Sequence, residues 1–175
     1  MTNEELIKEY PFLEVKDPYG PGNWSNCWLD DLEPGWRKAF GEDLCRDLKA
    51  AIEKDGCENT FEILQIKEKY AELRFYAVGY GDNVRNVISK YEELSRYICG
   101  HCGKPATKIT RGWYYPLCND CIEDIFGAYS PIENFYGFNS YEDVQKEVEK
   151  IKTDFKHEDY WKPIDLWKEC PTEEE

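Results

Sequence analysis

Four cysteines in the middle of the chain have the spacing of a metal site. Cys99, Cys102, Cys118 and Cys121 follow the pattern C-x2-C-x15-C-x2-C, which is typical of a tetrahedral zinc site built from two knuckles. Each pair lets one tight turn direct two sulfur atoms at a common point. Four thiolates fill the coordination shell of Zn2+ and leave no open position for water or substrate. We therefore expect a structural site and not a catalytic one.

Two other kinds of cysteine chemistry compete with zinc. The first pair is spelled Cys-Gly-His-Cys, and thiol–disulfide oxidoreductases carry such a pair at a helix N-terminus, which lowers the pKa of the first thiol. Gly103 and Pro105 disfavour a helix after Cys102, and this interpretation leaves the second pair unexplained. Structural disulfides fit less well, since the chain begins without the basic and apolar regions of a secretion signal. His101 is expected in a turn and not as a ligand.

The sequence offers little other catalytic chemistry. It contains two histidines, and neither an HExxH motif, a P-loop nor a Ser/His/Asp set follows from the spacing. Gly79 and Gly81 stand between an expected strand and an expected helix, but Val84 occupies the position where the dinucleotide fingerprint has glycine. A turn explains these glycines better. We expect no enzymatic activity.

A basic and aromatic cluster is the one feature that points to nucleic acid. No acidic residue occurs between Ser95 and Asn119. Basic and aromatic side chains together can follow a nucleic-acid backbone and stack on its bases. The same cations would also offset the negative charge of four thiolates, so both interpretations stay open. The candidate contacts are Arg96, Lys104, Lys108, Arg111 and Trp113.

The hydrophobic pattern predicts an α+β fold. Residues 60–66 and 73–78 are rich in β-branched and aromatic side chains, which indicates an antiparallel pair of strands joined by the polar stretch 67–72. Other segments repeat apolar residues at helical spacing. We expect a small antiparallel sheet with several helices and an inserted four-cysteine zinc ribbon. The expected helices cover residues 36–54, 84–94, 122–126 and 141–155.

Three parts of the chain follow from this pattern. Residues 1–98 are expected to form an α+β body with an aromatic-rich N-terminal segment, and residues 99–127 the zinc-ribbon module. Residues 128–175 are expected to pack an acidic helix and an aromatic tail on the body. Within the body, residues 79–83 should form a turn that caps the next helix, and Cys45 should lie in the core.

The net charge of -14 limits the partners. Acidic side chains outnumber basic ones 14 to 7 in residues 1–60 and 13 to 6 in 133–175, whereas 61–132 holds 9 of each. DNA phosphate repels such a protein unless a local patch overrides the field. No apolar stretch is long enough for a membrane span, since 33% of the residues are charged. Acidity favours solubility, and it also suits a partner with a basic groove.

Several segments resemble a known group of proteins. They are Tyr-Pro-Phe-Leu at 10–13, Gly-Trp-Arg-Lys-Ala-Phe-Gly at 35–41, the stretch 65–76 and the first knuckle at 99–106. In these segments the chain resembles small zinc-ribbon proteins encoded by phages and prophages of gut bacteria. In size, acidity and metal content it is also similar to zinc-containing type II-A anti-CRISPR proteins. This second resemblance implies a cytoplasmic protein of the bacterial host cell that inhibits Cas9.

The resemblance gives the acidity a use. Cas9 presents positively charged channels for nucleic acid, and a negative protein could occupy such a channel and block target DNA loading or cleavage. Cas9 is then the expected partner, with no direct nucleic-acid contact. The alternatives are a nucleic-acid-binding or transcription-associated zinc ribbon and a thiol–disulfide oxidoreductase that uses Cys99 and Cys102. The acidic residues expected to contact the partner are Glu142, Asp143, Glu147, Glu149, Asp154, Glu158 and Asp159.

Overall fold

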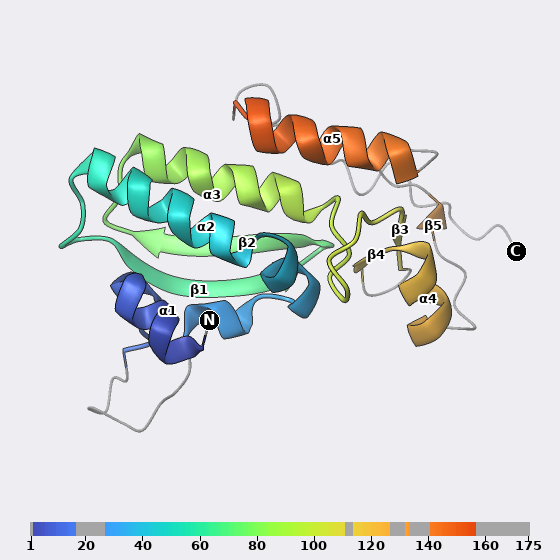
Figure 1. Ribbon diagram of the computed structural model, residues 1–175, viewed down its shortest axis with the longest axis horizontal. Coiled ribbons are helices and arrows are strands. Elements are labelled where there is room, and N and C mark those ends of the chain that lie inside the picture. Colours follow the sequence, from blue (N-terminus) through green and yellow to red (C-terminus); the bar gives the residue numbers. More distant parts are fainter. Residues whose placement is uncertain (1, 17–26, 111–113, 127–131, 134–140, 157–175) are drawn as a thin grey trace, which may run out of the picture.

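The structure is a computed structural model of the 175-residue chain. It describes residues 2–16, 27–110, 114–126, 132–133 and 141–156. Within these ranges five α-helices accompany a two-stranded antiparallel sheet and a small three-stranded sheet. This α+β architecture confirms the predicted fold class. Figure 1 shows the longer strands and most helices at one end of the molecule and the short strands with α4 at the other.

The larger sheet is a hairpin of β1 (Glu62–Lys69) and β2 (Glu72–Val78). Its turn consists of Tyr70 and Ala71, whose φ angles of 56° and 65° both lie in the left-handed region, as in a two-residue type I′ turn. The prediction that 67–72 is a polar loop is therefore wrong at both ends, because these residues continue the strands. A strand with one face open to solvent accepts polar residues on that face. A polar stretch in the sequence therefore does not mark the end of a strand.

Two helices cover this hairpin, and a third packs on the outside of one of them (Figure 1). α2 (Pro34–Asp55) packs against α3 (Asp82–Ser95), which lies against β2 and is covered in turn by α5 (Tyr141–Asp154). Pro34 begins α2, and Gly56 ends it with a φ of 64°, as expected for these residues at helix ends. The buried helix residues recur at helical spacing, as predicted. They are Trp36, Phe40, Leu44, Leu48, Val84, Ile88, Tyr91, Leu94, Val144, Val148 and Ile151.

The N-terminal segment packs beside the sheet. α1 (Asn3–Glu9) leads into the 3-10 helix η1 (Pro11–Leu13), and a second 3-10 helix, η2 (Trp28–Asp31), precedes α2. Both 3-10 helices contact β1. Leu6, Leu13 and Leu29 are buried in the main core, so this irregular segment contributes to folding.

α3 takes its N-terminal cap from another helix. Gly81 lies in the predicted turn and occupies the cap position, as expected, but it supplies no side-chain cap. The Asp55 carboxylate at the end of α2 instead accepts hydrogen bonds from the backbone N–H groups of Asn83 (3.3 Å) and Val84 (2.9 Å). The bond from Val84, followed by one from the Asn83 side chain, lowers the pKa of Asp55.

The outer edge of β2 is closed by side chains of α3. The Leu73 N–H donates to Ser95 Oγ (2.8 Å), and the Phe75 N–H donates to Glu92 Oε1 (3.0 Å). A sheet edge normally presents such N–H groups as a template for another strand. Here two backbone donors are satisfied within the chain, and Ser95 is fully buried in doing so.

The cap of α3 gives a first prediction. Asp55→Ala should lower the melting temperature by several degrees at pH 7, because two helix N–H groups lose their acceptor. The folded-state pKa of Asp55 lies below its ordinary value of 3.8, so its stabilisation is present above that value and is lost as the pH falls through the folded pKa. The gap between wild type and variant should therefore narrow below about pH 4.

Thermal unfolding followed by circular dichroism from pH 7 to pH 3 measures this gap. Glu42→Ala removes a carboxylate from the exposed side of α2 and serves as the control, which should melt like wild type. A gap that is constant across this pH range would contradict the assigned cap.

Candidate metal centre

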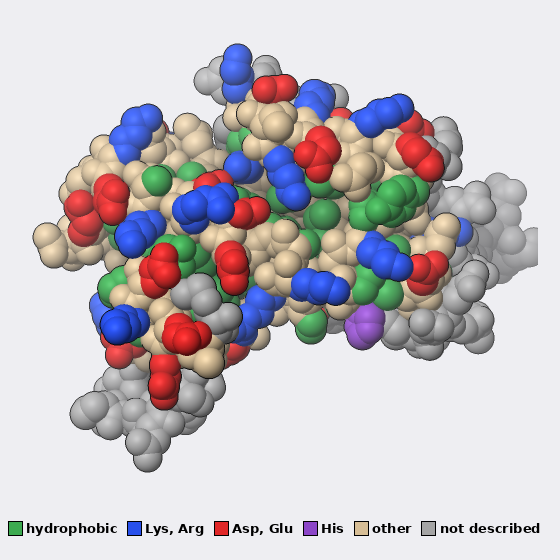
Figure 2. Space-filling model, viewed as in Figure 1, with side chains coloured by type: hydrophobic (Ala, Val, Ile, Leu, Met, Phe, Trp, Pro, Cys, Tyr) green, Lys and Arg blue, Asp and Glu red, His purple; other side chains and the backbone are tan. Residues whose placement is uncertain are grey.

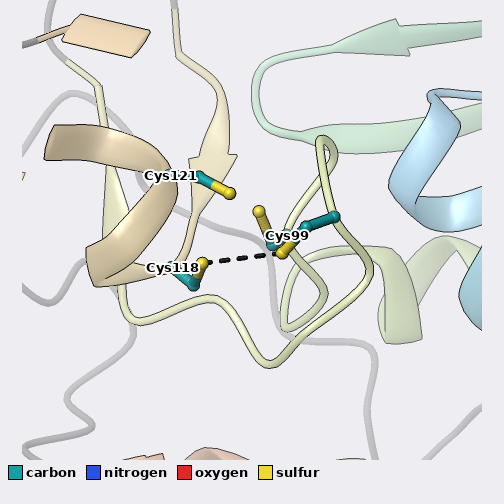
Figure 3. Close-up of side chains that lie close together, drawn as sticks. Cys99, Cys118 and Cys121 are labelled. Atoms are coloured by element: carbon teal, nitrogen blue, oxygen red, sulfur yellow. Dashed lines mark hydrogen bonds between the residues drawn. The ribbon is translucent and has the colours of Figure 1, made fainter. Parts of the chain in front are cut away.

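Two separate turns bring four sulfur atoms together. Cys99 and Cys102 lie in the turn after α3, while Cys118 precedes and Cys121 lies within α4 (Asn119–Phe126). All four Sγ atoms lie within 4.8 Å of one another, and those of Cys102 and Cys118 are 3.6 Å apart. Bonds of about 2.3 Å to one tetrahedral ion would place the sulfurs about 3.8 Å apart. The cluster therefore fits a single metal ion, and Figure 3 shows the labelled side chains converging on one point.

A small sheet holds the two turns side by side. β3 (Lys108–Ile109) lies between β4 (Pro116–Leu117) and β5 (Ile132–Glu133) and is antiparallel to both. The Gly100 N–H donates to the Pro116 carbonyl (2.9 Å) and ties the first turn directly to β4. β5 comes from beyond residue 127, so this sheet extends past the expected module.

Backbone hydrogen bonds shape each knuckle. The Gly103 N–H donates to the Cys99 carbonyl (3.0 Å), and the Cys99 N–H donates to the Lys104 carbonyl (2.7 Å). Gly103 has a φ of 82°, a conformation that glycine adopts without a steric penalty. In the second knuckle the Ile122 N–H donates to the Cys118 carbonyl (3.1 Å) and begins α4. The turns thus set the direction of the sulfurs.

The first knuckle is docked on the N-terminus of α2. The Gly35 N–H donates to the Gly100 carbonyl (2.6 Å), and Trp36 Nε1 donates to the Ile98 carbonyl (2.9 Å). The approach is so close that a Cβ on Gly35 would lie 2.1 Å from the Cys99 carbonyl oxygen. Trp36 is completely buried. The first knuckle, with Cys99 and Cys102, is therefore fixed to the main core by one helix end.

A second clamp comes from Tyr115. Its hydroxyl donates to the Glu33 carboxylate just before α2, and its ring fills the space where Gly100 would carry a Cβ, at 2.6 Å. Burial, followed by the hydrogen bond to Glu33, raises the pKa of Tyr115. The phenol therefore stays protonated and remains a donor.

The protein environment treats the four thiols differently. Burial raises the pKa of Cys118 and Cys121. At Cys102 burial acts in the same direction, but the Lys104 N–H and neighbouring sulfur groups outweigh it and lower the pKa. Buried thiols that resist ionisation need a cation to become thiolates, and metal binding supplies it with release of protons.

The structure bears on the oxidoreductase alternative. Residues 100–107 form turns and a bridge with no helix, so the helix N-terminus that would activate Cys99 is missing. Cys99 is fully buried, and all four sulfurs lie together. This geometry favours metal binding over thiol exchange.

Arg96 belongs to an ion network and not to an exposed basic strip. Its side chain is 15% exposed and pairs with the buried Glu72 and, at 2.7 Å, with Glu93. Arg74 pairs with the same Glu72. Buried charges need such partners. The Arg96 guanidinium is therefore engaged with carboxylates, whereas the sequence suggested that it contacts nucleic acid.

The other basic candidates differ in exposure and pairing. Lys104 is exposed, and its Nζ lies 2.9 Å from the Asp120 carboxylate. Lys108 is half-buried on β3. Arg111 and Trp113 lie outside the described residues. Of these candidates, Arg96 and Lys104 are each paired with a carboxylate in the described part of the chain.

Five of the seven acidic residues expected to contact a partner are found on α5. Asp143 pairs with Lys146 (3.8 Å) and Glu147 with Lys150 (3.7 Å), so part of the charge is balanced along the helix. Figure 2 likewise shows acidic and basic side chains interspersed on one face of the molecule. Exposed on α5 are Glu142, Glu149 and Asp154. Outside the described residues are Glu158 and Asp159.

Three further cysteines are buried away from the cluster. Cys45 is fully buried in the core, as predicted, and burial raises its pKa to about 12. Cys27 and Cys57 are also buried, and Cys170 lies outside the described residues. Buried thiols of this kind behave as small apolar side chains.

Comparison of the chain with protein-family models, with curated proteins and with solved structures finds no match. None of the described helices is long and apolar enough to cross a membrane. The docking contact between Gly35 and Gly100 was not predicted from the sequence. The sequence feature that could have indicated this contact is Gly35 directly before Trp36, at the start of a long predicted helix. In the structure this tryptophan is completely buried.

The docking contact gives a second prediction. Gly35→Ala should lower the free energy of unfolding by about 1–3 kcal/mol, because the new methyl group meets a backbone carbonyl that cannot move aside cheaply. Gly41→Ala is the matched control on the same helix, where the nearest atom is a flexible Arg37 side-chain carbon at 3.5 Å. It should be neutral or stabilising, since alanine favours a helix interior. Urea unfolding measures both, and equal effects would contradict the docking.

Proposed function

We propose that the four cysteines hold a structural Zn2+ and that the protein acts by binding. Its acidic surface would occupy a cationic surface of a partner protein, with no reaction catalysed. Four sulfur ligands in tetrahedral reach of one another suit zinc or iron, and zinc is the common occupant of structural sites of this spacing. With all four positions filled by protein, such an ion stabilises the fold and offers no site to a substrate.

The pairing of the arginines carries the binding proposal. Arginine is the preferred residue for phosphate groups, yet all five arginines in the described part of the chain form ion pairs with carboxylates: Arg37, Arg46, Arg74, Arg85 and Arg96. The chain carries a net charge of -14. Its long-range field therefore attracts cationic surfaces and repels nucleic acid.

Cas9 is the partner that the resemblance to anti-CRISPR proteins suggests. Its channels for guide and target are positively charged, so an acidic and rigid protein would be steered to them and compete with nucleic acid. Inhibition would then be stoichiometric. The exposed carboxylates of α5, which lies on the outside of α3 (Figure 1), support this segment as part of the contact.

The metal gives a third prediction. Purified protein should carry about one zinc per chain by elemental analysis, because the cluster has room for one ion. Cys102→Ser and Cys118→Ser should lose it, and their free energy of unfolding should fall by several kcal/mol, since metal binding contributes directly to folding. Cys45→Ala, a change in the core, should be destabilised and still hold zinc. Iron in place of zinc, or full zinc in either serine variant, would contradict the site.

Charge reversal gives a fourth prediction. At equimolar amounts the protein should abolish DNA cleavage by a type II Cas9 and co-purify with it. Glu142→Lys combined with Glu149→Lys should slow association about tenfold at low salt and flatten its salt dependence, because steering depends on the field. Lys152→Glu adds negative charge on the same helix and should have the opposite effect.

Surface plasmon resonance at several salt concentrations measures these rates. Unchanged association in the double variant would remove α5 from the contact. Binding to duplex or single-stranded DNA that is tighter than binding to Cas9 would overturn the proposed function, and a gel shift at stated salt concentration tests for it.

A further inference from the structure

A small apolar pocket lies far from the cysteine cluster. It has a volume of about 230 Å³ and lies between η1, the last turns of α2 and the residues that lead into β1. Phe12, Ile52 and Phe61 form its floor, and the two phenyl rings meet edge to face with centroids 5.8 Å apart. Figure 1 shows these elements at the end of the molecule opposite α4.

The rim of this pocket is acidic. Glu9, Glu53 and Glu58 line it together with one cation, Lys49. The Lys49 ammonium is directed to the end of α1, where it donates to the Glu9 carbonyl (3.4 Å) and lies 5.5 Å from the centre of the Tyr10 ring. Glu53 and Glu58 are exposed, and neither forms an ion pair with another described residue. The pocket thus combines an apolar floor with two uncompensated carboxylates.

We propose that this pocket receives one arginine side chain from a basic protein partner. The inference rests on the proposed function, because it names the group that the partner's cationic surface would insert. A volume of 230 Å³ lies below the 300–1,000 Å³ typical of small-molecule sites and suits a single side chain. The floor would take the aliphatic stem and one face of the guanidinium, and the carboxylates of Glu53 and Glu58 would accept its N–H groups.

Arginine fits this arrangement better than lysine. A guanidinium is weakly hydrated, stacks on aromatic rings and offers a planar set of donors that can serve two carboxylates at once. An ammonium is a compact and strongly hydrated charge, so it would lose more on entering an apolar pocket. Arginine is also among the residues that dominate the energy of protein interfaces. The pocket would act as an anchor point beside the broader electrostatic attraction.

A titration with short peptides tests the pocket without any partner protein. The isotope-labelled full-length chain is titrated by NMR with acetyl-Gly-Arg-Gly-amide, with its lysine analogue and with its citrulline analogue, which keeps the shape and loses the charge. The arginine peptide should shift the aromatic signals of Phe12 and Phe61 with a Kd on the order of millimolar. The lysine peptide should bind several-fold more weakly, and the citrulline peptide at least about tenfold more weakly.

Two charge-matched variants complete the test. Glu53→Gln with Glu58→Gln should weaken the arginine peptide about tenfold or more, whereas Glu42→Gln with Glu149→Gln removes the same charge elsewhere and should bind like wild type. Melting curves confirm that both variants fold. Equal binding of arginine and citrulline peptides, or equal loss in both variants, would overturn the pocket. A failed peptide titration overturns the arginine pocket and not the Cas9 proposal. A failed Cas9 assay overturns the Cas9 proposal and does not change the peptide result.

Discussion

A backbone contact between Gly35 and Gly100 joins the two parts of this protein, and it exists only because Gly35 has no side chain. The Gly35 N–H donates to the Gly100 carbonyl (2.6 Å). The adjacent Trp36 fixes the orientation of the helix end, because its Nε1 donates to the Ile98 carbonyl. A Cβ at position 35 would overlap the backbone of Cys99 and Gly100 in the first knuckle. This approach, the Trp36 hydrogen bond and the Tyr115 clamp together hold the sulfurs in place relative to the main core.

The two parts are stabilised by different means. The main core buries apolar residues of α1, α2, α3, α5 and the hairpin and follows the usual hydrophobic driving force. Among the described residues the second cluster has six buried members, Cys99, Ala106, Leu117, Cys118, Cys121 and Ile122, and half of these are cysteines of the candidate metal site. So small a cluster needs a metal or a docking surface to be stable. Because it is clamped to α2, a change in this cluster, including loss of the proposed metal ion, would reach the main core.

Much of this could be predicted from the sequence, and the failures have physical reasons. The positions of α2, α3, α4 and α5 and the cysteine site followed from periodicity and spacing, which are local signals, whereas the short helix α1 was not predicted. The hairpin turn at Tyr70 and Ala71 lacks the usual glycine or asparagine, so it left no local signal. The cap by Asp55 and the pairing of Arg96 with Glu72 join residues that lie far apart in the chain. Contacts of that kind depend on the folded arrangement.

The closed edge of β2 has a consequence for how this protein can behave at high concentration. Ser95 and Glu92 occupy the backbone donors of Leu73 and Phe75, so an incoming strand would first have to displace a helix from that side. Growth of the hairpin into a continuous ribbon of many chains is thereby obstructed along this border. Stoichiometric binding of the kind proposed would benefit from a chain that stays a discrete particle as it accumulates.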